Sequence, residues 1–445
     1  MLDSRLMPID SRPIGTEIMT STVASPTKPV GNDTTASLSD MLLPVVRSPM
    51  LDQEEELFAY ELVFYRQGAG TDADTTLVGG VLSGITDGAI TRLVRGNRAF
   101  MRLPRTLLLE QTDILAHTPR LGVIINPIHV RDTAVLQRLQ QLALRNCPLL
   151  LDLGSTDPNA SEPHGAQEPL LRLASYVRLD AKALDAETLA ARCKQLHDRG
   201  LSVIAGNVDD HETYARCKTL PFQAVQGRYL LVPQQIEVPV LTPSRLSLLR
   251  LMSALQDNNA GPVELGEIIR DDAVLSYKLL GCVNSAYFAL PRQLKSIQQA
   301  AIFFGVARLR NWIYTMSLSG MDDRPPELLR TALIRAHMCE KLAQGLPSGQ
   351  QEMAFMAGLL SLLDTLLCAP MEFVLSHLPL APEIRDALVE NRGPFAPMLE
   401  HVYAWEAGDL KGSQMQPQDI RRMAGAYYAA TQWADQVYSF AEQRA

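Results

Sequence analysis

Short β-rich runs alternate with helical stretches over residues 43–230, and this alternation constrains the fold more than any other feature of the sequence. The last five runs recur about every 25 residues, which is the length of one strand plus one helix. Eight runs with helices between most of them predict a (β/α)8-type barrel, with an open doubly wound sheet as the alternative. The predicted strands span 43–50, 58–66, 99–103, 122–126, 148–153, 176–180, 201–206 and 224–230.

The segments between these runs carry helix signals. Residues 133–146 have apolar side chains at helical spacing, and residues 185–200 form a second amphipathic stretch. Asp185 is a predicted N-cap, because its carboxylate can accept from free backbone N–H groups in the first turn. Gly200 is predicted to end the same helix in the left-handed conformation.

The second half of the chain has a different pattern. Residues 244–445 contain no convincing strand, only apolar stripes at helical spacing that proline and glycine interrupt, as at 244–256, 273–288 and 350–368. We therefore predict four parts: a disordered tail at 1–40, a barrel at 41–233, a linker at 234–243 and an all-α domain at 244–445. Three prolines between 232 and 243 support the linker, and a cut there is predicted to release two separately folded pieces.

Composition excludes several functions. The net charge of −8 argues against a protein that binds nucleic acid through a basic face. The six cysteines form no CxxC pair and are predicted to be free thiols in a reducing compartment. No apolar run is as long as a membrane span, and the N-terminus lacks a signal-peptide pattern. A cytoplasmic protein without membrane contact is the expected result.

In a barrel of parallel strands, the residues at the carboxyl ends of the strands build the site. Here those ends carry the charged residues Glu61, Arg102, Asp152 and Asp180. Three carboxylates beside an arginine are a poor cage for divalent cations, which need several converging oxygen ligands. Arg102 is predicted to pair with Glu61 or Asp152. Its replacement by Asn is predicted to destabilise the fold by about 1–3 kcal/mol without creating catalysis.

The order of these residues over 43–233 resembles the EAL domain, the cyclic di-GMP phosphodiesterase barrel. Glu61-Leu62-Val63 stands where that family has Glu-Ala-Leu, and Arg66 stands where it has a substrate-contacting arginine. Asp152 and Asp180 match acidic positions of two later strands, and Gln226-Gly227 matches the closing motif. The resemblance implies that Glu61 is a relic metal ligand. We favour instead a structural role, in which Glu61 pairs with an arginine.

Other positions depart from the EAL pattern. Arg102 replaces a metal-binding Asn, Arg178 replaces a lysine, and Gly206 replaces a glutamate. Ser48 and Leu153 replace a glutamine and an aspartate, and the glutamate expected near 125–126 is missing. These losses imply that the phosphodiesterase activity of the family is gone.

Residues 268–313 resemble the HDOD domain, a helical relative of the HD metal phosphohydrolases that generally lacks their metal site. The similarity lies in Asp272, in the hexapeptide 283–288 and in the segment 300–305, and it extends to about residue 408. The His-Asp pair of an HD site would fall at Ser361 and Leu362. Asp364 remains nearby, but one carboxylate cannot hold two metals.

Together these features predict a non-catalytic bacterial signalling protein with no cofactor and no bound metal. It would act through contacts with other signalling proteins in cyclic di-GMP-linked control of motility or biofilm formation, and a homodimer stays open. One alternative is a sensor that binds cyclic di-GMP without cleaving it, although Ser48, Gly206 and Arg102 make such binding doubtful. Another is a weak cyclic di-GMP phosphodiesterase.

Overall fold

The structure is a computed structural model of the 445-residue chain. It describes residues 44–64, 80–81, 84–85, 88–110, 118, 120–154, 167–233, 242–255, 261–269, 272–285, 288, 290–319, 321, 324–408, 415 and 417–442. Arg66, the predicted tail and almost all of the predicted linker lie outside these residues.

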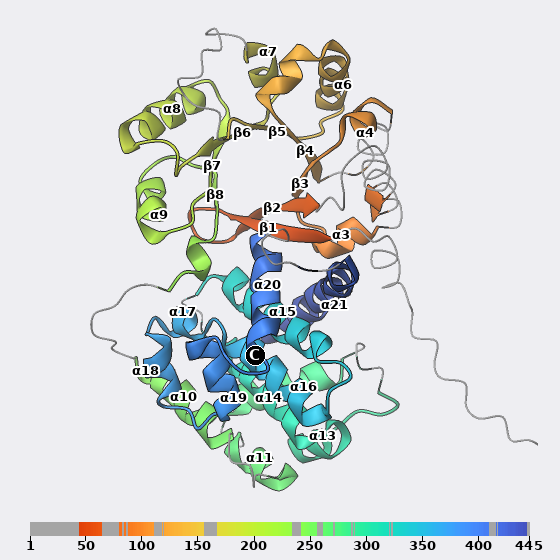
Figure 1. Cartoon of the computed structure of the whole chain (residues 1–445), viewed down its shortest axis with the longest axis vertical. Coiled ribbons are helices and arrows are strands. Elements are labelled where there is room, and N and C mark those ends of the chain that lie inside the picture. Colours follow the sequence, from red (N-terminus) through yellow and green to blue (C-terminus); the bar gives the residue numbers. More distant parts are fainter. Residues whose placement is uncertain are drawn as a thin grey trace, which may run out of the picture. The chain divides into compact units, whose positions relative to one another are not determined.

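Eight strands in the first half close into a barrel in sequence order, β1 to β8, and helices surround them (Figure 1). The closed sheet confirms the predicted (β/α)8-type architecture and rules out the open sheet. The strands are β1 Val45–Leu51, β2 Leu57–Phe64, β3 Ala99–Arg102, β4 Leu121–Ile125, β5 Leu149–Asp152, β6 Tyr176–Asp180, β7 Ser202–Gly206 and β8 Ala224–Gln226.

The first strand differs from the parallel arrangement that we assumed for the barrel. β1 runs antiparallel to both β2 and β8, and the other neighbouring pairs are parallel. The physical reason is the short connection at 52–56, because a parallel pair needs a crossover of a dozen or more residues. Asp52 stabilises this turn by accepting from the backbone N–H groups of Glu54 and Glu56. No crossover helix therefore lies between β1 and β2.

The barrel encloses its own apolar core. Met50, Phe100, Ile124, Leu150 and Ile204 are buried together inside it. Helices cover the outside, and the predicted N-cap is confirmed, because Asp185 accepts from the N–H of Thr188 at 2.9 Å. The elements around the barrel are α3 Ala89–Leu93, α4 Arg105–Glu110, η1 Pro127–Arg131, α6 Thr133–Leu144, α7 Glu168–Leu171, α8 Ala186–Asp198, α9 His211–Lys218 and η2 Tyr229–Leu231.

The described part of the second half is helical, as predicted. Its elements are α10 Pro243–Leu255, α11 Pro262–Ile268, α12 Ala273–Val283, α13 Ile297–Phe304, α14 Val306–Leu318, α15 Pro326–Leu342, α16 Ser348–Leu360, α17 Leu363–Leu367, α18 Met371–Leu375, α19 Pro382–Arg385, η4 Asp386–Glu390, α20 Ala396–Ala407 and α21 Pro417–Glu442. None of the described helices is both long and apolar enough to span a membrane.

One predicted helix is broken in the structure. The stripe at 350–368 forms α16 and α17 with an interruption at Ser361 and Leu362. The hydroxyl of Ser361 donates to the carbonyl of Gly358 at 2.7 Å and accepts from Arg335 at 3.2 Å. Such a local side-chain bond to the backbone competes with regular helix geometry, and it ends α16 at the position where the HD pair was expected.

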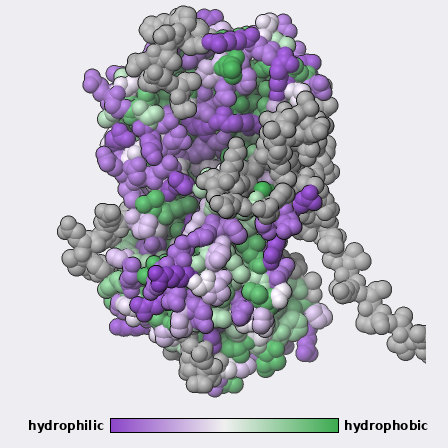
Figure 2. Space-filling model, in the orientation of Figure 1, coloured by the Kyte–Doolittle hydropathy of each residue, from purple (hydrophilic) through white to green (hydrophobic). Residues whose placement is uncertain are grey.

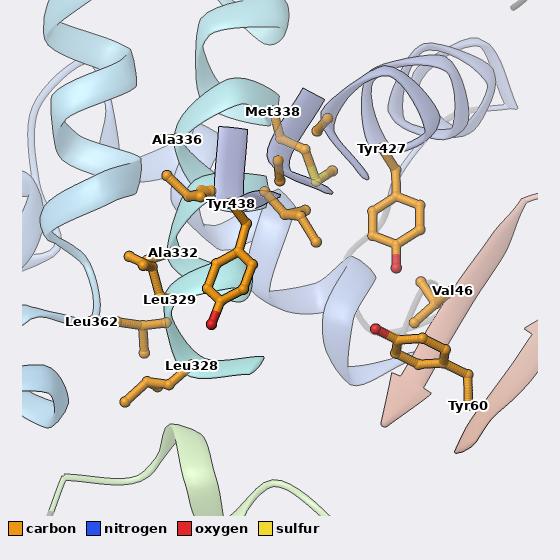
Figure 3. Packing of buried hydrophobic residues seen from close by; sticks show 14 of the residues in the cluster. Val46, Tyr60, Leu328, Leu329, Ala332, Ala336, Met338, Leu362, Tyr427 and Tyr438 are labelled. Atoms are coloured by element: carbon orange, nitrogen blue, oxygen red, sulfur yellow. The ribbon is translucent and has the colours of Figure 1, made fainter. Parts of the chain in front are cut away.

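Residues 35–445 form one compact unit, so the barrel and the helices share a continuous apolar interior. The outer face of β1 and β2 contacts helices of the second half, and Figure 3 shows Tyr427 of α21 pointing toward the strands that carry Val46 and Tyr60. The visible face of the barrel in Figure 2 is largely hydrophilic, as expected when apolar side chains fill the interior. The predicted domain boundaries stay a prediction.

Candidate functional site at the barrel mouth

A cavity of about 980 Å³ opens at the carboxyl ends of the parallel strands. Arg66 lies outside the described residues, and the six other barrel positions singled out from the sequence all line this cavity. They are Glu61, Arg102, Asp152, Arg178, Asp180 and Gln226. The strand ends thus bring together residues that are up to 165 positions apart in sequence.

Arg178, on β6, is the central group of the site. Its guanidinium donates to Asp152 through Nε at 3.2 Å and through Nη2 at 2.6 Å. Its Nη1 donates to Glu61 Oε2 at 2.5 Å and to Gln226 Oε1 at 2.6 Å. Arg178 is buried, with only 8% of its surface exposed. One buried cation therefore pairs with both carboxylates.

Gln226 completes the network from β8. While its amide oxygen accepts from Arg178, its Nε2 donates to Glu61 at 2.8 Å and to the hydroxyl of Ser48 at 3.1 Å. Ser48 lies opposite Glu61 in the register of β1 and β2. The serine that replaces the glutamine of the EAL pattern is thus part of the same hydrogen-bonded set.

The predicted pairing of Arg102 is confirmed, and it involves both carboxylates. Arg102 donates to Asp152, its Nε lies 3.6 Å from Glu61 Oε1, and its Nη1 donates to Asn126 at 2.9 Å. However, 45% of its side chain is exposed. Solvent screens such a pair, so Arg102 contributes less than the buried Arg178.

Electrostatics favour the charged form of the network. Burial by itself would raise the pKa of Asp152, but Arg178 and Arg102 outweigh it and hold this pKa below its ordinary value. Burial would likewise lower the pKa of Arg178, yet the neighbouring Glu61 and Asp152 raise it above its usual value. Both shifts stabilise the charged forms of Asp152 and Arg178.

Gly206 explains why the arginine fits. A Cβ atom at this position would lie 2.9 Å from Cδ and 3.0 Å from Cγ of Arg178. The side chain of Arg178 has little freedom to shift, because its guanidinium is hydrogen-bonded on three sides. A glutamate at position 206 would collide with this arginine, so two departures from the EAL pattern depend on each other sterically.

Asp180 lies in the cavity wall but outside the arginine network. Its carboxylate accepts from the N–H groups of Lys182 and Ala183 at 3.0 and 2.9 Å and from Asn207 Nδ2 at 2.7 Å. These bonds fix the turn after β6. Asp180 is thus a turn-stabilising residue in this geometry.

The site does not fit the divalent metals that the EAL resemblance implies. A metal site needs oxygen ligands with free lone pairs directed at one point, and Arg178 and Arg102 already bind the carboxylates of Glu61 and Asp152. A cation placed there would also meet two guanidinium groups. Among the residues that the structure describes, no three His, Cys, Asp or Glu side chains form a group that could hold a metal ion.

In the helical half, an arginine from a neighbouring helix contacts the position expected for the HD pair. Arg335 of α15 contacts Ser361 and binds Glu406 of α20 through Nε at 2.8 Å and Nη2 at 2.7 Å. Leu362 is buried in the apolar core. Burial raises the pKa of Asp364, which accepts from Thr365.

Sequence reasoning missed Arg335 and Glu406 and gave Arg102 the role that Arg178 has. Arg335 and Arg330 lie among apolar residues of the segment 328–339, and charged residues within a buried stripe are the signal that could have identified Arg335. The sequence gives no comparable signal for the partner of Arg335, because Glu406 is 71 residues away along the chain.

Comparison with known proteins identifies the second half. Residues 242–372 match the family model of the HDOD domain. The chain contains an HDOD domain. The match covers the helical half from α10 to the start of α18, and the elements α19, η4, α20 and α21 follow it.

Two curated relatives cover most of the chain. The uncharacterized protein YuxH of Bacillus subtilis (strain 168) is 26% identical over 407 residues, which are 87% of this chain and 97% of YuxH. The cyclic di-GMP phosphodiesterase CdgJ of Vibrio cholerae serotype O1 is 24% identical over 380 residues, which are 83% of this chain and 86% of CdgJ. Similarity over these lengths includes both the barrel and the HDOD domain.

Among solved structures, the EAL-like domain protein YdiV is 20% identical, with a TM-score of 0.33. The match covers 42% of this chain and 90% of YdiV. The structure thus combines a closed eight-stranded barrel with a helical half that contains the HDOD match.

Proposed function

We propose that this protein is a non-catalytic regulator in cyclic di-GMP signalling and that it acts by binding other signalling proteins. The observation that carries the proposal is the position of Arg178, whose guanidinium binds Glu61, Asp152 and Gln226 at the centre of the mouth. A phosphodiesterase of this class needs metal ions to activate water and to neutralise the phosphate. An arginine supplies positive charge but cannot coordinate and activate water as a metal ion does, and its pKa is too high for it to transfer a proton.

The charge of the mouth also argues against tight binding of cyclic di-GMP. Among the residues that the structure describes, five carboxylates line the cavity against three guanidinium groups, a net charge of −2 for this set. The carboxylates are Glu61, Asp152, Asp180, Asp209 and Glu406, and the guanidinium groups are those of Arg102, Arg178 and Arg228. A ligand with two phosphates is repelled by such a surface when no metal compensates.

A sensor that binds cyclic di-GMP without cleaving it is the second candidate, and the size of the cavity favours it. A volume of about 980 Å³ lies at the upper end of the range for small-molecule sites, roughly 300–1,000 Å³. Within the described part of the wall, Arg102 and Arg228 are exposed cations, with 45% and 59% of their side chains accessible. They are the residues through which a phosphate would bind.

A hydrolysis assay with cyclic di-GMP and either Mg²⁺ or Mn²⁺ tests the first proposal. We expect no turnover by the full chain under conditions in which CdgJ of Vibrio cholerae is active. The double variant Arg102→Asn, Arg178→Lys restores two residues of the EAL pattern and should stay inactive, because Leu153 and Gly206 are unchanged. Metal-dependent turnover by the unmodified chain would refute the proposal.

Calorimetry with cyclic di-GMP separates the two candidates. The regulator proposal predicts no heat of binding at micromolar concentrations, with or without Mg²⁺. Saturable binding that the variant Arg228→Gln weakens and that leaves the nucleotide uncleaved would establish the sensor. Elemental analysis of the dialysed protein should show no stoichiometric Mg, Mn, Fe or Zn in either candidate.

A further inference from the structure

The β1–β2 hairpin is joined directly, without a crossover helix, and on its outer face Arg47 donates to the carbonyl of Leu93 in α3 at 2.9 Å. Arg47 and Tyr60, on this face, are buried, with 5% and 0% exposed. Helices α15 and α21 of the HDOD half contact them. The HDOD half therefore adds α15 and α21 to the elements that cover this face of the barrel.

Charged groups, and not only apolar contacts, hold this layer in place. Arg47 binds Asp435 of α21 through both terminal nitrogens, at 2.8 and 3.0 Å. Tyr60 donates its hydroxyl to Glu327 of α15 at 3.0 Å, and Arg330 binds the same carboxylate at 2.8 Å. Such buried pairs have strict geometry, so they fix where the helices contact the hairpin.

Helix α21 also completes the hydrogen bonding of β1. Strand β8 has three residues and pairs with β1 at Met50 and Leu51 only. At Arg47, the backbone N–H donates instead to the hydroxyl of Tyr427 at 3.1 Å. A side chain of the HDOD half thus takes the place of a strand partner at the mouth end of the barrel.

The inner face of the same hairpin carries the mouth network. Side chains alternate between the two faces of a strand, so the residues that follow Arg47 and Tyr60 point inward. They are Ser48 and Glu61, which both bind Gln226. The neighbouring residues Arg47 and Ser48 on β1, and Tyr60 and Glu61 on β2, therefore connect the HDOD contact on the outer face to the mouth on the inner face.

We propose that the mouth of the barrel and the contact with the HDOD half are energetically coupled through the β1–β2 hairpin. A group that enters the mouth and breaks the bonds of Gln226 to Ser48 or Glu61 loosens the contact with α15 and α21. Coupling of this kind is reciprocal, so a partner that displaces α21 weakens the hydrogen bonds of Gln226 at the mouth. The coupling does not require that the mouth bind cyclic di-GMP or that the protein be inactive.

Hydrogen exchange of the full chain, followed by mass spectrometry, tests the coupling in both directions. Gln226→Leu alters the mouth, and we expect amides of α21 between 423 and 438 to exchange roughly 5- to 30-fold faster, the effect of losing one or two buried hydrogen bonds. Tyr427→Phe removes one acceptor at the HDOD contact. It should speed exchange at 224–226 of β8 by a similar factor.

Arg199→Ala is the matched control, since it breaks the exposed pair with Glu168 on the barrel surface, away from the hairpin. It should leave exchange in both regions unchanged. If Gln226→Leu does not fold, Ser48→Ala removes a single hydrogen bond from the same network. Changes confined to the mutated side in both directions, or equal changes in the control, would overturn the proposal.

Discussion

Two arginines at the mouth contribute differently to the stability of the fold, although the sequence analysis assigned a pairing role only to the exposed one, Arg102. Arg178 is buried and binds both carboxylates, whereas Arg102 is 45% exposed at its side chain. The estimate of about 1–3 kcal/mol for Arg102→Asn therefore exceeds what the structure supports, because an exposed pair contributes roughly 0–1 kcal/mol.

We predict that Arg178→Met destabilises the protein far more than Arg102→Asn. Removing one partner of a buried ion pair typically costs about 3–5 kcal/mol, because the remaining charges stay buried. For Arg102→Asn we expect about 1 kcal/mol or less. Urea denaturation at pH 7 measures both values, with Arg199→Gln at an exposed pair as the control. Equal losses for the two variants would contradict the central role of Arg178.

His337 is a buried titratable residue between α15 and α21. Its ring stacks on Trp433 at 4.8 Å, and Nδ1 lies 2.9 Å from Glu340. Burial lowers the pKa of His337, although Glu340 opposes this shift. In the unfolded chain the imidazole of His337 takes up a proton near pH 6.5, whereas in the folded chain it stays neutral at this pH. Protonation of His337 therefore favours unfolding.

Stability should therefore be constant above about pH 7.5 and fall as the pH drops from about 7 to 5. His337→Phe keeps a ring against Trp433 and should lose the part of this slope that belongs to His337. His377→Gln, at an exposed position, is the control and should keep the full slope. Urea midpoints measured across this pH range decide the question, and identical slopes for all three proteins would refute the assignment.

At the scale of elements, the barrel closes through a close backbone contact between the turns after β7 and β8. The N–H of Val208 donates to Gln226 at 3.1 Å, and the N–H of Tyr229 donates back to Val208 at 3.1 Å. A Cβ on Gly227 would lie 1.8 Å from the carbonyl oxygen of Val208. Only glycine permits this approach, which also places Gln226 in the mouth.

Gly227→Ala should therefore destabilise the fold at the upper end of the roughly 1–3 kcal/mol that overpacking costs. Gly281→Ala is the control, because a Cβ there meets no atom within 4 Å and alanine is favoured in a helix. Thermal melts of the two variants should differ clearly in direction. A neutral Gly227→Ala would show that the turn has room to move.

At the scale of the whole molecule, the HDOD half is part of the structural support of the barrel. Arg47, Tyr60 and Tyr427 are buried where the two halves meet. A barrel released by cutting the linker would expose this face and leave Arg47 without Asp435. The prolines of the linker suggested that a cut there releases two separately folded pieces. Because of this contact, we now expect the barrel to depend on the helical half for its stability.

After cleavage at a protease site inserted within 234–241, the two pieces should stay associated on size exclusion at neutral pH. The barrel piece expressed alone should bind a hydrophobic dye and lack a cooperative melt. The complex of the two pieces is the control and should melt cooperatively. Two pieces that separate freely and each melt cooperatively would restore the interpretation of independent domains.

The sequence by itself determined the elements and their order. Period-2 and period-3.6 patterns are local, so they predicted eight strands, the helical second half and the cap at Asp185. The mouth residues could be predicted as a set, because the carboxyl ends of parallel strands must meet. Glycine at 206 and arginine at 178 were visible as departures, but not as a pair.

Only the tertiary structure decided which charges meet. Arg178 binds Glu61 across 117 residues, and Arg47 binds Asp435 across 388. No local pattern encodes such a pairing, because it depends on strand register, on side-chain reach and on the antiparallel β1 that leaves one face of the barrel open to the HDOD half. Long-range ion pairs are set by packing geometry, and the sequence shows only that each charge needs a partner.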